Sequence, residues 1–86
     1  QQLADDLAEY QRFDRALRRS QELLLPLAEE KVALTLAGYR SGANELASVI
    51  AARRELIEAR LKHIDFEQAR ALSSARLHFA YEGVSQ

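Results

Sequence analysis

The sequence predicts an all-α fold, an antiparallel two-helix coiled-coil hairpin with one tight turn near 40–44. Large apolar residues recur in steps of three and four along both halves of the 86-residue chain, the spacing that places them on one face of a helix. Residues typical of a turn lie almost at the midpoint of the chain, where this spacing is broken. We therefore expect one domain over 1–86, with a helix over 2–40, a turn over 41–44 and a helix over 45–81. Two matched arms around a tight turn make a helical hairpin.

The first arm carries one apolar stripe, interrupted by the polar Gln21. Its members are Leu3, Leu7, Tyr10, Phe13, Leu17, Leu24, Ala28, Val32, Leu36 and Tyr39. The residues from Leu23 to Leu27 broaden the apolar surface, so we expect this segment to touch more than one neighbour. Pro26 removes one backbone hydrogen bond from a helix. Because the periodicity continues on both sides, we expect a kink near Pro26, and the alternative is a true break near Leu25.

The turn ends the first helix and begins the second. Gly42 can adopt the positive φ that ends a helix, and Asn44 can cap the next helix by accepting a bond from a free backbone N–H. The tip is neither arm nor chain end, which makes it the natural place for contact with a partner. The candidate partner-binding residues are Tyr39, Arg40, Ser41, Gly42, Ala43, Asn44 and Glu45.

The second arm carries another stripe, and Gly83 is the expected stop after it. The stripe consists of Leu46, Ile50, Ile57, Leu61, Ile64, Leu72, Ala75 and Phe79, with Val49 and Leu56 in a neighbouring stripe. Two helices alone bury little apolar surface, and small domains are marginal for that reason. We therefore expect self-association, a dimer that buries both stripes as a four-helix bundle, or a larger parent protein. A start at Gln1 without a signal peptide favours a fragment of a larger protein.

Composition argues against several classes of function. The net charge is −1 and the signs are mixed along both arms, whereas a nucleic-acid binder shows a basic stripe. Absence of cysteine excludes disulfides and thiolate metal sites. His63 and His78 lie fifteen positions apart on one expected helix, too far to share a metal within a chain, and we expect them to be surface or packing residues. A rod also lacks a pocket that could activate a carboxylate, so we expect no enzyme, no cofactor and no metal site.

Three stretches together resemble the final helical hairpin of TolC-like outer-membrane efflux factors. They are Pro26-Leu27-Ala28-Glu29-Glu30, Gly38-Tyr39-Arg40-Ser41-Gly42 and the run from Leu46 through Val49-Ile50-Ala51-Ala52-Arg53-Arg54 to Leu56. The family pattern is a helix ending in Tyr-x-x-Gly, a short turn, and a helix that opens with an apolar pair followed by Ala- and Arg-rich sequence. The resemblance covers nearly all of this chain and a fraction of a full family member.

The resemblance implies a parent trimer with an outer-membrane β-barrel and a periplasmic α-helical barrel, of which this hairpin forms part of the wall. The tip would dock the hairpin of a periplasmic adaptor (membrane fusion) protein, and the assembly would join an inner-membrane pump and export small solutes. A free-standing or adaptor-type hairpin for protein–protein interaction is the alternative. A parent gene that also encodes β-strands and a preceding helical hairpin would indicate the channel, because only the channel needs them.

Individual residues carry over to the family pattern only in part. Tyr39 matches the tyrosine that helps to hold the channel entrance closed, and Gly42 matches the turn glycine at the adaptor contact. Asn44 stands where the best-known member has an arginine of the gate network. Ser48 and Ala51 replace two aspartates, so no acidic ring is expected at that level. Glu45 and the Ala/Arg-rich continuation lean toward the heavy-metal efflux branch, and the exported solute stays open.

Overall fold

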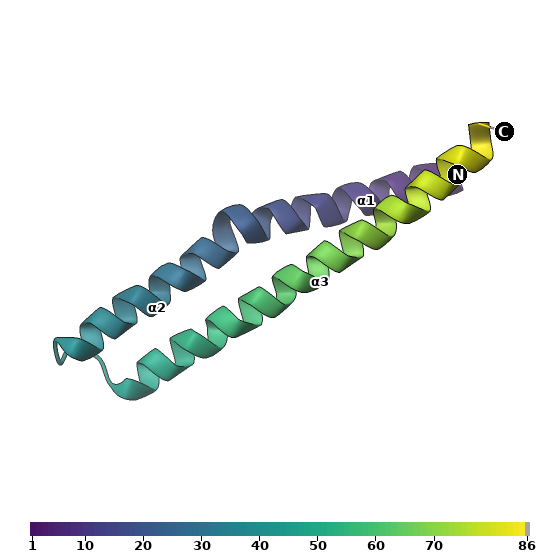
Figure 1. Ribbon diagram of the computed structural model, residues 1–86. Coiled ribbons are helices and arrows are strands. Elements are labelled where there is room, and N and C mark those ends of the chain that lie inside the picture. Colours follow the sequence, from purple (N-terminus) through teal and green to yellow (C-terminus); the bar gives the residue numbers. More distant parts are fainter. Residues whose placement is uncertain (86) are drawn as a thin grey trace.

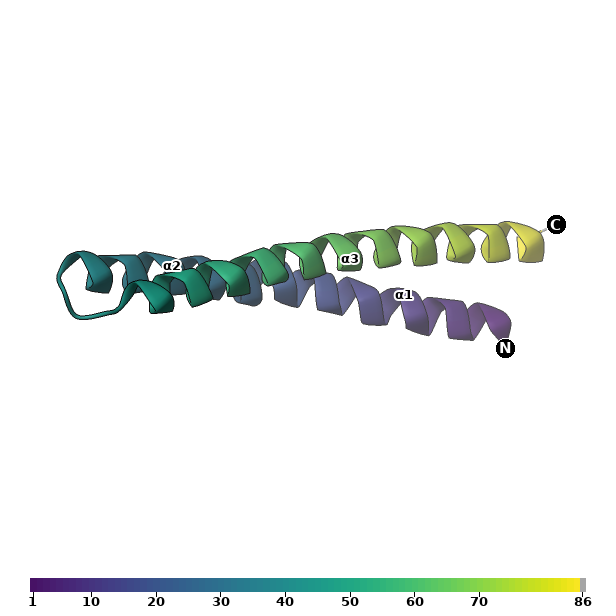
Figure 2. The same ribbon diagram turned by 90° about the horizontal axis from the view of Figure 1, so that it is seen from below.

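A computed structural model describes the backbone of residues 1–85 and the side chains as far as Gly83. The chain forms a rod of 67 × 15 × 14 Å in which a first arm folds back along a second (Figure 1). The elements are α1 (Gln2–Arg19), a short π-helical turn η1 (Ser20–Leu24), α2 (Leu25–Arg40) and α3 (Leu46–Ser85). The expected all-α hairpin is confirmed. In Figure 2 the two arms cross along their length, with α2 beside one half of α3 and α1 beside the other.

The surface of α3 that faces the first arm follows a seven-residue repeat. Apart from Ala69, its buried and half-buried residues alternate in steps of three and four: Val49, Ala52, Leu56, Ala59, His63, Phe66, Arg70, Ser73, Leu77 and Ala80. We call this set the inner seam. A seven-residue repeat is the spacing that keeps one helix face against a partner in a coiled coil. The small Ala52, which is 1% exposed, leaves room for the first arm to approach closely.

The apolar stripe named from the sequence on the second arm does not face the first arm. Its large apolar members are exposed: Leu46, Ile50, Ile57, Leu61, Ile64, Leu72 and Phe79. We call these seven residues the outer stripe. The neighbouring stripe, which contains Val49 and Leu56, is the one that is buried. Helical spacing identifies both stripes, but it does not say which of them faces the other arm of the same chain.

The first arm runs as helix across Pro26, and it bends near η1 (Figure 1). The ring of Pro26 would collide with the carbonyl four residues earlier in a regular α-helix. A π-helical turn lies just before Pro26, and its wider backbone turn makes room for the ring. Up to Ser20 the buried side follows steps of three and four, and it resumes at Leu25, five residues later instead of four. The π turn therefore inserts one residue into the repeat. Ser20 and Leu25 face α3, while Gln21 and Leu24 are exposed.

The second helix begins and ends later than the sequence predicted. It starts at Leu46 instead of Glu45 and continues to Ser85 instead of ending near Tyr81. Gly83 lies inside α3 and does not stop it. Among the described residues only Gly42 has a positive φ, so Gly83 keeps ordinary helical geometry.

Candidate functional site

The tip of the hairpin begins with a closed helix end. Gly42 has φ 84°. The N–H of Ala43 donates to the carbonyl of Gly38 at 2.8 Å, and the N–H of Gly42 donates to the carbonyl of Tyr39 at 3.1 Å. This pair of bonds is the Schellman motif, in which a residue with positive φ satisfies the last carbonyls of a helix. The expected role of Gly42 as the residue that ends the first helix is confirmed.

Asn44 does not cap α3. Its side-chain Nδ2 donates backwards to the carbonyl of Thr35 at 3.2 Å, and its backbone N–H donates to the carbonyl of Gly38 at 3.1 Å. Instead, the backbone carbonyl of Glu45 accepts the N–H of Ser48 at 3.0 Å. The carbonyl of Gly38 is one of the last four of α2, which have no partner inside the helix. The loop is therefore tied to the first arm.

Gly38 is a tip residue that sequence reasoning missed. A Cβ atom at this position would overlap the side-chain amide of Asn44, so the absence of a side chain lets Asn44 lie across the helix. A glycine inside a helix costs about 1 kcal/mol relative to alanine. A glycine inside a helical pattern was the available signal in the sequence, because such a glycine usually has a packing reason.

Replacing Gly42 by alanine is expected to lower the free energy of unfolding by about 1–2 kcal/mol, the cost of a left-handed conformation for a residue with a Cβ. Nothing lies within 4 Å of the added atom, so the effect is one of backbone strain. Gly42→Asn is expected to cost less. Gly83→Ala is the matched control, and because its site is open and helical it should gain about 0.5–1 kcal/mol. Urea unfolding followed by circular dichroism measures all three. Equal stability of wild type and Gly42→Ala would contradict the left-handed conformation assigned to Gly42.

The tip candidates are brought together at one end of the rod. Tyr39 and Arg40 form the last turn of α2, and the five residues from Ser41 to Glu45 are all exposed. The hydroxyl of Ser41 donates to the carbonyl of Gly38 at 3.0 Å. Tyr39 was expected on the buried stripe, but it is 42% exposed. Its ring is thus available to a neighbouring molecule.

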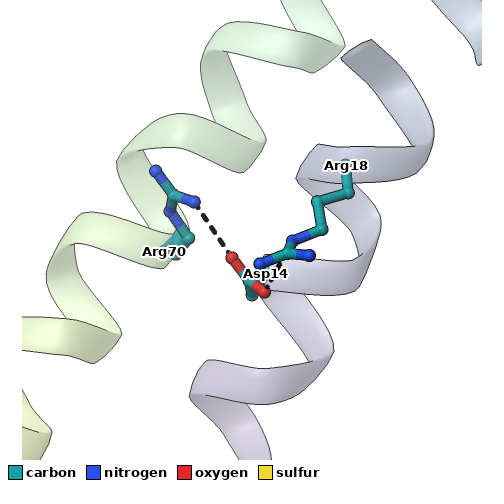
Figure 3. Close-up of polar contacts among 3 residues, drawn as sticks. All are labelled: Asp14, Arg18 and Arg70. Atoms are coloured by element: carbon teal, nitrogen blue, oxygen red, sulfur yellow. Dashed lines mark hydrogen bonds and ion pairs between the residues drawn. The ribbon is translucent and has the colours of Figure 1, made fainter. Parts of the chain in front are cut away.

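Polar contacts join the arms in the half of the rod away from the tip. Arg70 donates to Asp14 at 3.0 Å, and Arg18 reaches the other oxygen of the same carboxylate at 3.1 Å (Figure 3). The Asp14–Arg18 contact joins residues four apart on one helix, whereas Arg70 comes from the other arm. Because one carboxylate holds groups from α1 and α3 together, this contact helps to fix the alignment of the arms.

His63 packs between the arms and is not a surface group. Its Nδ1 shares a hydrogen bond of 3.0 Å with the hydroxyl of Ser20, which is 2% exposed in the π-helical turn. Nearer the open end, Ser73 donates to Glu9 at 3.4 Å. Both contacts satisfy buried polar groups inside a thin seam, where an unpaired hydroxyl costs about 1–3 kcal/mol.

The outer stripe is the second candidate site. Of the large apolar side chains in the described part of the chain, fourteen are exposed, while the buried apolar set is limited to Leu17, Val49, Ala52 and Leu56. Covering a half-exposed Leu or Ile contributes roughly 1 kcal/mol, and association itself costs at least about 4 kcal/mol. The seven residues of the outer stripe together are enough to exceed that cost. In the described part of the hairpin, more large apolar side chains are exposed than are fully buried.

The described residues contain no cluster of side chains that could hold a metal ion. No group of three or more His, Cys, Asp or Glu side chains comes together in that part of the chain. His78 lies 3.0 Å from Glu82 one turn later on α3, and both are surface groups. Within the same residues, no helix has the length and apolar character needed to cross a bilayer.

Comparisons with known proteins give no neighbour. No protein-family model matches the chain, and neither a curated protein nor a solved structure does.

Proposed function

We propose that the chain is a wall hairpin of a TolC-like outer-membrane efflux channel. In this proposal the two arms form part of the periplasmic α-helical barrel of a trimeric parent protein in the outer membrane. The tip docks a periplasmic adaptor protein, and the assembly exports small solutes with an inner-membrane pump. No catalytic role is assigned to any residue.

One observation carries the proposal: α3 presents large apolar side chains on two of its faces. The inner seam contacts the first arm, and the outer stripe, from Leu46 to Phe79, remains exposed. A helix of this kind fits between two helical neighbours, as in a closed wall of helices. A free-standing hairpin that binds its partner through the tip would not need an apolar face that continues far from the tip.

The tip supports the docking role. Gly42 and Ala43 add little side-chain bulk at the turn, and they are exposed. Another hairpin can approach this surface closely. Contact through so small an area is weak at a single site, so several copies in one ring must act together. Tyr39, exposed at the end of α2, is the residue proposed to help close the channel entrance.

The docking role is tested by photocrosslinking to the purified adaptor. A photoreactive phenylalanine at Ala43 is expected to crosslink to the adaptor hairpin, whereas the same residue at Glu58, on the exposed shaft, is not. Ala43→Leu is expected to weaken adaptor capture by about tenfold and to leave helix content unchanged. Ala43 is preferable to Gly42 for this purpose, because any side chain at Gly42 strains the turn. Crosslinking from Glu58 alone, or full capture by Ala43→Leu, rejects tip docking.

A further inference from the structure

The joint between α1 and α2 holds two contacts that a regular helix could not make at once. Ser20 is 2% exposed, and its hydroxyl shares a 3.0 Å hydrogen bond with Nδ1 of His63 on α3. Ala28, eight residues later, is half-buried as well, and in a two-helix rod only the other arm can cover it. In a regular helix, residues eight apart point about 80° away from each other. The π-helical turn η1, in which the N–H of Leu25 donates to the carbonyl of Ser20, takes up this difference.

Leu24 lies beside a groove between the arms. The groove has a volume of about 350 Å³, and its lining includes Ser20, Leu24, Ala59 and Phe66. Leu24 itself is 38% exposed. The four carbon atoms of a leucine side chain take up about as much space as four water molecules, roughly 120 Å³. The groove is therefore large enough to take the side chain of Leu24.

A regular helix would turn Leu24 toward α3. Leu24 follows Leu17, the buried residue of α1, by seven positions, and in a regular helix the two would point within about 20° of each other. Leu25 would then point about 80° away from Leu17. In the structure Leu25 is the half-buried leucine and Leu24 is exposed. A regular helix would thus exchange Leu25 for Leu24 at the second arm.

We propose that η1 is a two-state joint. In the first state, which the structure shows, Ser20 bonds His63 and Leu25 faces α3. In the second state the segment is a regular helix, Ser20 leaves His63, and Leu24 fills the groove beside Phe66. A π-helical turn is a single-turn insertion in an α-helix, so the exchange rearranges one turn and leaves the rest of both arms helical.

Pro26 sets the balance between the two states. In a regular helix its ring meets the carbonyl of Glu22, which disfavours the second state by roughly a hundredfold. The bond between Ser20 and His63 adds to the same preference. Because the balance depends on one proline and one hydrogen bond, a molecule that binds one state better than the other can shift it. The joint lies in the shaft, and its behaviour does not depend on the proposed docking at the tip.

Cysteine labelling at low protein concentration tests for the second state, because the chain has no cysteine of its own. Leu24→Cys and Leu25→Cys are each made in the wild-type background and in a background that carries Ser20→Ala with Pro26→Ala. Alanine is the better residue in a helix interior, so the variant background is expected to keep its helix content by circular dichroism. There the thiol at position 24 is expected to react about tenfold more slowly than in the wild type, and the thiol at position 25 correspondingly faster.

Leu23→Cys is the matched control. Leu23 is 43% exposed, and a regular helix would point it about 120° away from Leu17, so its thiol should react equally fast in both backgrounds. An unchanged ratio of the rates at positions 24 and 25 would overturn the two-state joint. Slower reaction at all three positions would overturn it too, since that result shows a general tightening of the hairpin and not an exchange of leucines.

Pro26→Ala alone is the second variant. It keeps the bond between Ser20 and His63, and it is expected to shift the ratio of the two rates in the same direction but by a smaller factor. Loss of helix content in both variant backgrounds would show that the segment cannot form a regular helix against α3, and it would also reject the second state.

Discussion

Leu56→Ala is expected to lower the free energy of unfolding of the hairpin by about 2–4 kcal/mol. Leu56 is 9% exposed and lies in the inner seam against α2. Shortening it removes buried methyl groups and leaves a gap that the two arms fill only in part. Since the hairpin encloses few other large side chains, the loss is a considerable share of its total stability. Urea unfolding at low protein concentration, followed by circular dichroism, measures the change.

Leu61→Ala is the matched control for this measurement. It removes the same atoms from the same helix, but Leu61 is 58% exposed. Its effect on the single hairpin is therefore expected to stay within about 0.5 kcal/mol, whereas its effect on association should be large. The reverse order, with Leu61→Ala the more damaging change at low concentration, would mean that the arms pack through the outer stripe.

Deleting one residue tests the role of the π-helical turn. Removal of Gln21, which is exposed, brings Ser20 and Leu25 to a four-residue spacing and makes the repeat of the first arm continuous. A regular helix would then bring Pro26 against the carbonyl of Glu22, at a cost of roughly 3 kcal/mol. The double variant, deletion of Gln21 with Pro26→Ala, is therefore expected to fold at least as stably as the wild type.

Deleting Lys62 from α3 is the control. Lys62 is also exposed, but its removal turns every later residue of α3 by one position. Glu67 then takes the place of Phe66 in the inner seam, and Arg70 leaves the position where it binds Asp14. Loss of the open half of the hairpin is expected, seen as a drop in helix content and several kcal/mol of stability. Equal tolerance of both deletions would show that η1 is not a one-residue insertion.

The sequence was sufficient for the hairpin, the position of the turn and the role of Gly42, because each depends on local spacing or on backbone geometry. It was not sufficient to say which of two stripes on α3 faces the first arm. The outer stripe has bulkier side chains than the inner seam, so it is the more prominent of the two in the sequence. Small residues such as Ala52 are buried because they let helices approach closely. They are overlooked when an apolar stripe is defined by its large side chains.

The tip shows a similar limit. Asn44 is suited both to capping a following helix and to bonding a preceding one, and its choice of Thr35 depends on the space that Gly38 leaves. That space exists only once the loop is folded. The polar contacts of His63 and Arg70 with the other arm were missed for the same reason, since their partners lie more than forty residues away in the sequence.

Sedimentation equilibrium of the chain tests most directly the claim that the hairpin is built to lie between helical neighbours. The apparent mass is expected to rise with concentration above the 9.7 kDa of one chain, and Ile57→Ser with Leu61→Ser is expected to return it to that value without loss of helix. A chain that stays at one-chain mass at every concentration, and melts cooperatively in that state, would contradict the claim.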